Sequence, residues 1–447
     1  MKKTYAVVGT GGRAISYLQP MLTTHRAHCD LVGLCDLSPT RMAHYNECLV
    51  RDWGYHAVPA YSADRFDEML LKEAPDVVIV CTVDAMHHHY IIRALELGCD
   101  VITEKPMTID AAKCRRVLEA VRSTGRHLRV AFNYRWQAYR TKVREVLASG
   151  AIGRVKTVNM EYLLDTHHGA DYFRRWHAHI DQSGGLLVHK STHHFDLVNW
   201  WLDAIPATVF AYGDLFFYGE KNALTRGDVA LVAYDRYTGT ASEHDPFRLD
   251  LADHGKLEKL YLNAEPDTGY RRDRNVFRDD ITIQDAMSVN VRYRTGQLLT
   301  YSLTCFSPRE GMRVTFNGDR GRLEYNEFRG THIIRGQSDE ELAREQAGRG
   351  DEAGESIRVY PHFKASYDVT AVRGAGGHGG ADPVLAEQLF SPLAPRDPWH
   401  RAAGHEQGAA SILVGIAGNQ SMAENRPIGI GELVPLQPVA TKLSELV

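Results

Sequence analysis

Short apolar runs alternate with amphipathic stretches through the first 132 residues of the chain. The apolar runs resemble strands buried on both faces, and they lie at residues 6–8, 31–34, 77–81, 101–103 and 128–132. Amphipathic stretches such as residues 91–97 and 111–121 separate these runs and predict helices. Strands that alternate with helices in this way are typical of an α/β domain built on a doubly wound parallel sheet. We therefore expect such a domain over residues 1–132.

Period-two alternation of apolar and polar positions replaces this pattern after residue 133. It is found at residues 155–163, 209–217, 289–293, 298–305 and 313–317. This alternation predicts a large, open and mainly antiparallel sheet with one face in water. One helix, expected over residues 186–202, interrupts the run of strands. Residues 133–447 are thus predicted to form a second α/β domain that binds substrate and mediates oligomerisation.

Two segments of the second domain depart from the alternation. Residues 221–280 are polar and weakly patterned, which predicts an insertion or arm. Residues 382–424 have helical patterns that would close the domain, at 383–390 and 402–424.

Composition and charge exclude several classes of protein. The chain has 447 residues, of which 44% are apolar, and this is enough for two cores. A net charge of −4 with both signs mixed gives no basis for nucleic-acid binding. No apolar run approaches the roughly 20 residues of a membrane span, and the first residues lack a leader pattern, so we expect a cytoplasmic protein. The seven cysteines include no CxxC spacing and predict neither disulfides nor a zinc–thiolate site.

A glycine motif directly follows the first predicted strand. Gly9, Gly11 and Ala14 form the pattern GxGxxA, with Gly12 and Arg13 inside it. The first glycine allows a tight turn, the second lets the backbone approach a pyrophosphate, and the small third residue lets helix and strand pack closely. Phosphates would then sit at the helix N-terminus, as in a Rossmann domain.

An acid at the end of the second predicted strand indicates which dinucleotide is bound. The carboxylate of Asp36 would accept hydrogen bonds from the adenosine ribose and repel a 2′-phosphate, so NAD is favoured. Arg41 lies nearby in the sequence and leaves NADP open as an alternative.

A tripeptide after a later strand makes the interpretation more specific. Glu104-Lys105-Pro106, with the segments 82–87 and 94–98 before it and 133–135 after it, resembles the glucose-fructose oxidoreductase / inositol dehydrogenase / MocA family. The resemblance implies a nicotinamide over the open sheet face and substrates that are sugars, inositols or their keto forms. It also implies that Lys105 touches the reacting hydroxyl. The expected cofactor-binding residues are Gly9, Gly11, Gly12, Arg13, Ala14, Asp36, Thr82, His87, Glu104, Lys105 and Asn133.

The helix expected over residues 186–202 carries a second family motif. His193, Asp196 and Trp200 match the pattern of the family, while His189 replaces its usual aspartate. On one continuous helix these four side chains would share a face, with Lys190 and His194 beside them. The expected catalytic residues are Lys105, His193, Lys190 and His189. Zinc on two histidines of the helix is an alternative, but no further ligand has a recognisable spacing, so no metal is expected.

Residues 165–177 are dense in polar and aromatic groups, as sugar sites are, although a solvated loop would have the same composition. Adjacent arginines there could hold an anionic sugar substituent. The expected substrate-binding residues are Tyr134, Arg135, His167, Tyr172, Arg174, Arg175, Trp176 and His194.

The surplus of acid–base groups favours one reaction over simpler ones. The stretches 188–196 and 172–177 resemble those of NAD-dependent glycosidases, including enzymes that cleave sulfoquinovosides. Such enzymes oxidise C3 of a pyranoside, eliminate the C1 substituent, add water and return the hydride. Alternatives are a sugar or polyol dehydrogenase, a 3-keto-sugar reductase, or a non-catalytic NAD-binding sensor. We also expect a homo-oligomer, either a dimer or a dimer of dimers, because the large sheet has one face without covering helices.

Overall fold

The computed structural model describes residues 2–242, 244–329, 354–372, 374 and 377–446. Seven strands form the first sheet, in the order β15-β6-β5-β4-β1-β2-β3. All neighbours are parallel except β15, which runs antiparallel to β6. The strands are β1 (Lys3–Val8), β2 (Cys29–Asp36), β3 (Ala60–Ser62), β4 (Val77–Val80), β5 (Asp100–Thr103), β6 (Leu128–Val130) and β15 (Ala403–Gly404). This sheet confirms the doubly wound α/β domain expected from the alternation.

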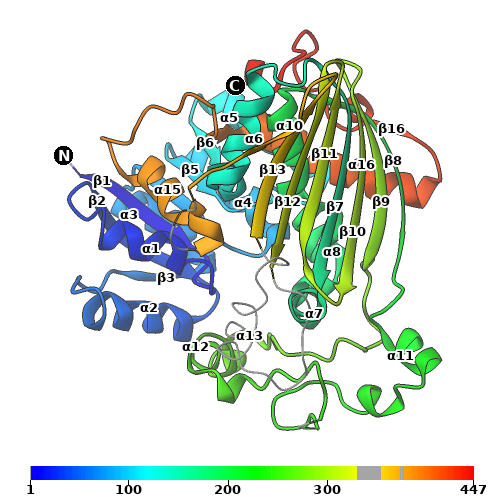
Figure 1. Ribbon diagram of the computed structural model, residues 1–447. Helices are drawn as coiled ribbons and strands as arrows, with labels where there is room; N and C mark the ends of the chain where they lie inside the picture. Colours follow the sequence, from blue (N-terminus) through cyan, green and yellow to red (C-terminus); the bar gives the residue numbers. More distant parts are fainter. Residues whose placement is uncertain (1, 243, 330–353, 373, 375–376, 447) are drawn as a thin grey trace.

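Helices from both ends of the chain pack around this sheet (Figure 1). Five of them connect its strands: α1 (Ile15–Leu22), α2 (Pro39–Arg51), α3 (Phe66–Glu73), α4 (His87–Glu96) and α5 (Ala111–Thr124). A sixth, α15 (Gly377–Phe390), comes from the second half of the chain and packs against α1, and its last residue, Phe390, contacts the ring of Tyr5 of β1 edge-on. The C-terminal region therefore completes the nucleotide domain with a helix and an edge strand.

Nine strands form the second sheet, in the order β14-β13-β12-β11-β7-β10-β9-β8-β16. All neighbours are antiparallel except β7 and β10, which are parallel. The strands are β7 (Val155–Asp165), β8 (Pro206–Asp214), β9 (Ala286–Tyr293), β10 (Leu298–Ser307), β11 (Glu310–Gly318), β12 (Gly321–Arg329), β13 (Gly354–Pro361), β14 (Tyr367–Val369) and β16 (Ile428–Gly429). This arrangement confirms the large, mainly antiparallel sheet.

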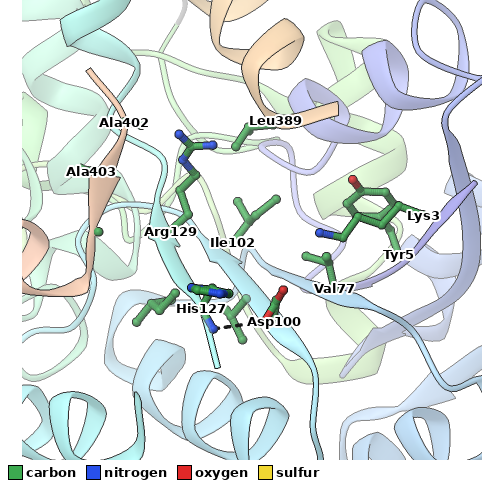
Figure 2. Close-up of a pocket in the computed structure, with 13 residues that line it drawn as sticks. Lys3, Tyr5, Val77, Asp100, Ile102, His127, Arg129, Leu389, Ala402 and Ala403 are labelled. Atoms are coloured by element: carbon green, nitrogen blue, oxygen red, sulfur yellow. Dashed lines mark hydrogen bonds between the residues drawn. The ribbon is translucent and has the colours of Figure 1, made fainter. Parts of the chain in front are cut away.

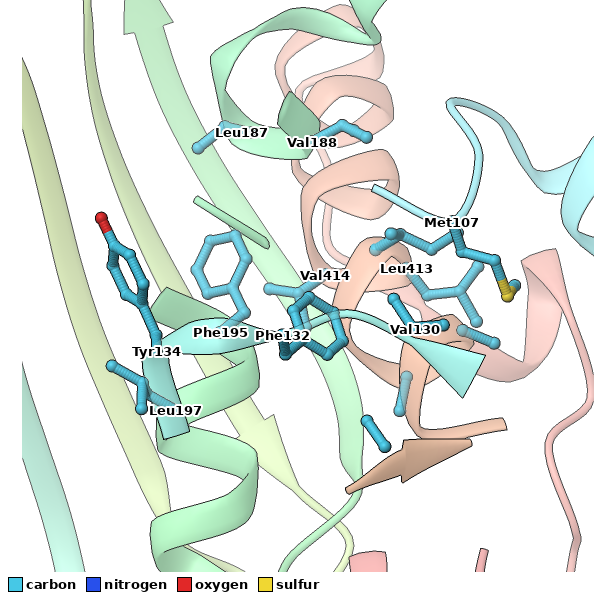
Figure 3. Packing of buried hydrophobic residues seen from close by; sticks show 14 of the residues in the cluster. Met107, Val130, Phe132, Tyr134, Leu187, Val188, Phe195, Leu197, Leu413 and Val414 are labelled. Atoms are coloured by element: carbon cyan, nitrogen blue, oxygen red, sulfur yellow. The ribbon is translucent and has the colours of Figure 1, made fainter. Parts of the chain in front are cut away.

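Alternate residues of the long strands are buried, so one face of the second sheet packs on helices. That face contacts α6 (Ala138–Ala148), α10 (Thr192–Leu202) and α16 (His405–Glu424), as Figure 1 shows. Trp201 on α10 meets Phe316 and Tyr325 edge-on. The apolar contacts continue into the first domain, because Phe132 and Val130 lie beside Val414 and Leu413 of α16 (Figure 3). The two domains share this cluster.

The helix expected over residues 186–202 is interrupted, so that prediction was wrong. The chain forms α9 (Gly185–His189), interrupts the α-helical hydrogen-bond pattern at Lys190 and Ser191, and resumes as α10. The amide of Ser191 donates to the carbonyl of Leu186, five residues back, which widens the turn. His189 is consequently not on the face of α10 that carries His193.

The polar segment 221–280 forms an arm that crosses back to the first domain. It contains α11 (Glu220–Arg226), α12 (Gly255–Leu257), a π-helical turn η7 (Glu258–Leu262) and α13 (Glu265–Thr268). The turn η7 packs on α2, and in Figure 1 the arm runs along the bottom of the molecule from α11, below the second sheet, to α12 and α13 near α2. Leu260 is buried in the core of that domain.

A cavity of about 400 Å³ lies at the edge of the first sheet where the parallel strands begin (Figure 2). Its lining includes Lys3, Val77, Asp100 and Leu128, which are the first residues of their strands. In open α/β sheets, ligands bind at the carboxyl ends of the strands, so this cavity is not part of the nucleotide site. No helix of the described ranges is long and apolar enough to cross a membrane.

One buried ion pair joins three elements of the structure. Arg135, in the turn η3 (Asn133–Trp136) after β6, donates from Nε to Asp196 of α10 at 2.8 Å and from Nη2 at 2.6 Å. Both side chains are fully buried. Ser411 and Gln407 of α16 complete the network, with Ser411 donating to Asp196 and Gln407 accepting from Arg135. A buried charge whose partner is removed is strongly destabilising.

We expect Asp196→Ala to lower the free energy of unfolding by about 3–5 kcal/mol, because the guanidinium of Arg135 stays buried without its counter-charge. Urea denaturation followed by circular dichroism measures the change. Glu68→Ala is the control, because it removes an exposed pair with Arg65 and should leave the midpoint nearly unchanged. Equal midpoints for the two variants would contradict this role of the pair.

Candidate active site

The glycine turn lies between β1 and α1, at the carboxyl edge of the first sheet. Gly9 has a φ of +91°, and a Cβ there would lie 2.5 Å from the carbonyl carbon of Cys81. Only glycine fits this position, because the turn passes directly over the end of β4. The backbone amide of Gly12 donates to the hydroxyl of Tyr261, a residue of the arm, at 2.9 Å. The turn therefore offers a donor where a dinucleotide would place a phosphate oxygen.

Asp36 ends β2 beside the turn and holds it in place. Its carboxylate accepts hydrogen bonds from the amide and hydroxyl of Thr10 and from the amide of Ser38. Arg41 lies 3.2 Å from the same carboxylate. A carboxylate offers about four acceptor positions, so most of those on Asp36 already serve the protein. Asp36 therefore supports dinucleotide binding in two ways: it holds the glycine turn in place, and it puts a negative charge beside the expected position of the ribose.

Lys105 and Asp84 follow two neighbouring parallel strands, β5 and β4, and so meet at the same edge. Between them lies His189, at the end of α9. The Nζ of Lys105 is 3.4 Å from Nε2 of His189 and donates to the carbonyl of His189 at 3.1 Å. Nδ1 of His189 is hydrogen-bonded to Asp84. The tautomer that satisfies both neighbours carries its proton on Nδ1 and presents Nε2 to Lys105.

Burial controls the protonation of these three groups. It lowers the pKa of Lys105, against the opposing charges of Asp84 and Glu104. It lowers the pKa of His189 well below its usual value, with the charge of Lys105 adding to the effect. It raises the pKa of Asp84 well above its usual value. A lysine of lowered pKa beside a neutral imidazole is suited to proton transfer near neutral pH.

A second proton-handling pair lies beside the first. Lys190, in the break between α9 and α10, donates to the hydroxyl of Tyr134 at 3.2 Å and lies 5.0 Å from the ring centre of Tyr162. Burial alone would raise the pKa of Tyr134, but the charges of Lys190 and Arg140 lower it to about 8. The phenols hold the pKa of Lys190 well above its usual value against burial. The pair is a permanent ammonium beside a phenol that ionises near physiological pH.

Comparison with known proteins agrees with this arrangement. Residues 3–132 match the model of an oxidoreductase family's NAD-binding Rossmann fold, and residues 144–430 match the model of the family's C-terminal alpha/beta domain. The chain belongs to the GFO/IDH/MocA oxidoreductase family. Its N-terminal domain binds NAD, and the turn and acid described above fit that cofactor.

Individual relatives of this GFO/IDH/MocA member differ in how much they share. The putative oxidoreductase YteT of Bacillus subtilis is 38% identical over 98% of this chain and 100% of its own length. D-glucoside 3-dehydrogenase of Escherichia coli is 29% identical over 34% of this chain and 40% of the relative. The WlbA dehydrogenase of Bordetella pertussis, solved with NADH and UDP-GlcNAcA, has a TM-score of 0.62 at 16% identity, covering 98% of this chain and 99% of that one. That structural likeness shows a shared fold.

The remaining cofactor residues expected from the sequence lie around the turn, several of them already engaged within the protein. Glu104 is hydrogen-bonded to Arg13 and accepts from the hydroxyl of Tyr17 at 2.6 Å. Asn133 donates to Asp382 at 2.8 Å. His87 is buried, and its ring nitrogens lie 2.7 Å from the carbonyl of Pro106 and 3.1 Å from that of Thr82. His87 and Glu104 thus position the loops that carry Thr82 and Lys105.

Several expected substrate-binding residues lie in the region of the two proton-handling pairs. Tyr172 and Trp176 meet His189 edge-on, with ring centres 5.6 and 5.9 Å away. Tyr134 is part of the second pair, and His193 stacks on its ring at 3.9 Å. Arg175 lies on the arm side, where it pairs with Asp171 at 2.9 Å.

Three other assignments from the sequence are corrected by the structure. Arg135 is the buried partner of Asp196 and cannot reach a substrate. Arg174 is buried, where it donates to the carbonyl of Phe247 and lies over the ring of Tyr237. His194 is fully buried behind the ring of Tyr162, and its Nδ1 is 2.8 Å from the hydroxyl of Tyr301. Each of these polar groups is committed to packing within the protein.

His167 is exposed, and its neighbour His168 lies closer to the site. Nδ1 of His168 is 2.8 Å from Glu310, and its Nε2 is 3.2 Å from the hydroxyl of Tyr172. Sequence reasoning also missed Asp84, Tyr162 and His177. Asp84 had a detectable signal, because an acid directly after a strand of the sheet falls at the edge where ligands bind.

We expect Asp36→Ala to weaken NAD binding and to improve NADP relative to NAD. The substitution loosens the glycine turn and frees Arg41 to pair with a 2′-phosphate. Calorimetry with both dinucleotides measures the two affinities. Adding Arg41→Ala to the variant should remove the relative gain for NADP. Equal affinity of the unmodified protein for NAD and NADP would contradict the role given to Asp36.

Proposed function

We propose that the protein is an NAD-dependent enzyme that hydrolyses a glycoside by transient oxidation of C3 of the sugar. The observation that carries the proposal is the presence of two adjacent proton-handling pairs, Lys105–His189 and Tyr134–Lys190. A simple alcohol dehydrogenation requires one base. Elimination next to a newly formed ketone requires a second base, at C2.

The first pair is assigned to the hydroxyl that is oxidised. NAD, held by the glycine turn, would supply the hydride acceptor for C3 and the donor for its return to the same carbon. Nζ of Lys105 takes the hydroxyl proton as an unprotonated amine, which its lowered pKa makes available. Nε2 of His189 lies 3.4 Å from Nζ of Lys105, close enough to accept that proton in turn, and Asp84 orients the imidazole through Nδ1.

The second pair is assigned to C2. The ketone at C3 makes the C2 proton acidic, and the phenolate of Tyr134 removes it. The C1–O bond then breaks, and the departing oxygen takes the proton that Tyr134 received from C2, so that the alcohol leaves neutral and Tyr134 is again a phenolate. Lys190 stays protonated and stabilises the phenolate and the developing enolate. Lys190 is one of the catalytic residues expected from the sequence, but its raised pKa keeps it protonated, so the phenol of Tyr134 is the better base. Water adds to C1 and gives up a proton, which Tyr134 passes to C2. Reduction of the C3 ketone then restores the hydroxyl, with the proton that Lys105 took in the first step returning to the C3 oxygen.

A net dehydrogenase is the second candidate. D-glucoside 3-dehydrogenase, the relative noted above, carries C3 oxidation of a glycoside in its name. The same first step would suit this chain, with Lys105 as the base. A keto-sugar reductase would use that step in reverse, and a non-catalytic sensor would bind NAD without turnover. The sugar itself, including an anionic one such as a sulfoquinovoside, stays a prediction, and it loses the support of the buried Arg174.

The decisive experiment uses deuterated water, an alkyl glycoside and catalytic NAD. We expect free sugar that carries deuterium at C2, with no net NADH, because the hydride returns to C3 while the C2 proton exchanges with solvent. Nuclear magnetic resonance of the product measures both. Stoichiometric NADH and keto-glycoside with an intact glycosidic bond would identify a dehydrogenase.

We expect aglycone release to rise through about pH 8 as Tyr134 ionises, because only its phenolate accepts a proton. Tyr134→Phe should remove this limb of the pH profile and slow release by about 10² or more. Formation of NADH in the first turnover should persist. Tyr301→Phe is the matched control, because that phenol is buried against Ser191 and His194 and should leave the profile unchanged. An unaltered profile for Tyr134→Phe would assign C2 to another base.

We also propose a homo-oligomer that pairs through the open face of the nine-stranded sheet. In support, alternate residues of β9 and β10 are exposed on that face, and two apolar side chains of the sheet, Tyr212 and Leu298, are 62% and 49% exposed. We expect light scattering at micromolar concentration to give the mass of a dimer or tetramer. Arg substitution at Tyr212 should lower that mass if this face is the interface, and a monomeric mass for the unmodified protein would contradict the proposal.

A further inference from the structure

The arm is attached to the nucleotide domain at two points beside the glycine turn. The hydroxyl of Tyr261 in η7 accepts a hydrogen bond from the amide of Gly12, as described above. Asp267 of α13 accepts from the hydroxyl of Ser38 and from the amide of Thr40 at 3.1 Å, at the start of α2. The arm therefore lies over the position that a dinucleotide takes when its phosphates meet the turn.

A cationic cluster lies behind Tyr261. Arg175 and Arg272 share one carboxylate, that of Asp171, at 2.9 and 3.0 Å. No second acid pairs with either arginine among the described residues, so the cluster carries one uncompensated positive charge. The guanidinium of Arg272 lies 5.4 Å from the ring centre of Tyr261. The charges of Arg175 and Arg272 also add to the effect of burial in lowering the pKa of His177, whose ring centre lies 4.1 Å from that of His189.

Several buried donors of the cluster lack partners within the described part of the chain. They are Nε of Arg175, Nε of Arg272 and the hydroxyl of Tyr270. Buried polar groups are normally hydrogen-bonded, so donors gathered beside an uncompensated charge indicate an anion that the cluster is built to hold. The nearest anion that the family's chemistry supplies is the pyrophosphate of NAD, since the Gly12 amide lies at the same place.

We propose that Tyr261 and Arg272 form the outer wall of the pyrophosphate site, so that NAD is enclosed between the glycine turn and the arm. A phosphate oxygen would accept the hydrogen bond that the Gly12 amide now donates to Tyr261, and the hydroxyl of Tyr261 would then donate to the same oxygen. Arg272 supplies the counter-charge through its planar set of donors. Because the arm covers the site, the dinucleotide leaves only when the arm lifts. This inference rests on NAD binding and not on the proposed glycoside reaction.

The test measures binding to the full-length protein without substrate. We expect Arg272→Gln to raise the Kd of NAD and of ADP-ribose by the same factor, about ten-fold or more, because both ligands contain the pyrophosphate. Calorimetry gives both constants. Arg271→Gln is the matched control, since its side chain is half exposed on the same arm and contacts only Asp235 among the described acids. It should change neither constant.

A second variant tests the enclosure itself. Tyr261→Phe keeps the ring and removes the hydroxyl, and we expect it to speed NADH release several-fold in stopped-flow displacement, because one donor to the phosphate is lost. Unchanged Kd values in Arg272→Gln and an unchanged release rate in Tyr261→Phe would overturn the proposal. So would an unchanged NAD affinity in Arg272→Gln with a raised substrate KM, which would assign the cluster to an anionic substrate. Neither outcome bears on C2 exchange, so this proposal and the glycosidase reaction fail separately.

Discussion

The buried pair of Arg135 and Asp196 is the constraint on which the candidate site depends. It fixes the turn after β6 against α10 and α16, and each of its residues adjoins a residue of the site. Tyr134 precedes Arg135, and His193 lies one helical turn before Asp196. The stacking of His193 on Tyr134, and with it the contact between Tyr134 and Lys190, follows from that register. A buried ion pair thus sets the geometry of the contact between Lys190 and Tyr134.

The fold was predictable because its signals are local. The alternation of apolar runs with amphipathic stretches, and the later period-two alternation of apolar and polar residues, can be read from the sequence without knowledge of tertiary contacts. The glycine turn and Asp36 were found for a similar reason, since each follows a strand at a fixed place in the pattern, whereas the role of Lys105 came from the family resemblance of Glu104-Lys105-Pro106. The break at Lys190 and Ser191 was missed because helical spacing was extended through it, whereas an amide bonding five residues back widens the turn. That single change separates His189 from His193.

The rest of the site depends on contacts that sequence spacing does not encode. Arg174 and Arg175 are neighbours in the chain, yet one is buried against Phe247 and the other lies in the cationic cluster. Their positions at the end of α7 (Thr166–Arg174) point them in different directions. The arm had weak patterning because its contacts are made by Tyr261 and Asp267 to the first domain, more than 200 residues away. Such contacts are properties of the assembled fold.

Burial of two amines in one region explains why the site divides into two functions. Lys190 is surrounded by phenols, which hold its pKa high and keep it protonated. Lys105 faces carboxylates, but burial outweighs their charges and lowers its pKa. The charge of Lys190 further lowers the pKa of Lys105, so the stable ammonium helps to make the other amine a base. A reaction that removes a hydride and later returns it also requires that the dinucleotide stay bound throughout. In the reaction proposed above, the different protonation states of the two amines and the proposed enclosure by the arm would meet the same requirement, because each proton and the hydride that leave the sugar must be held until they return.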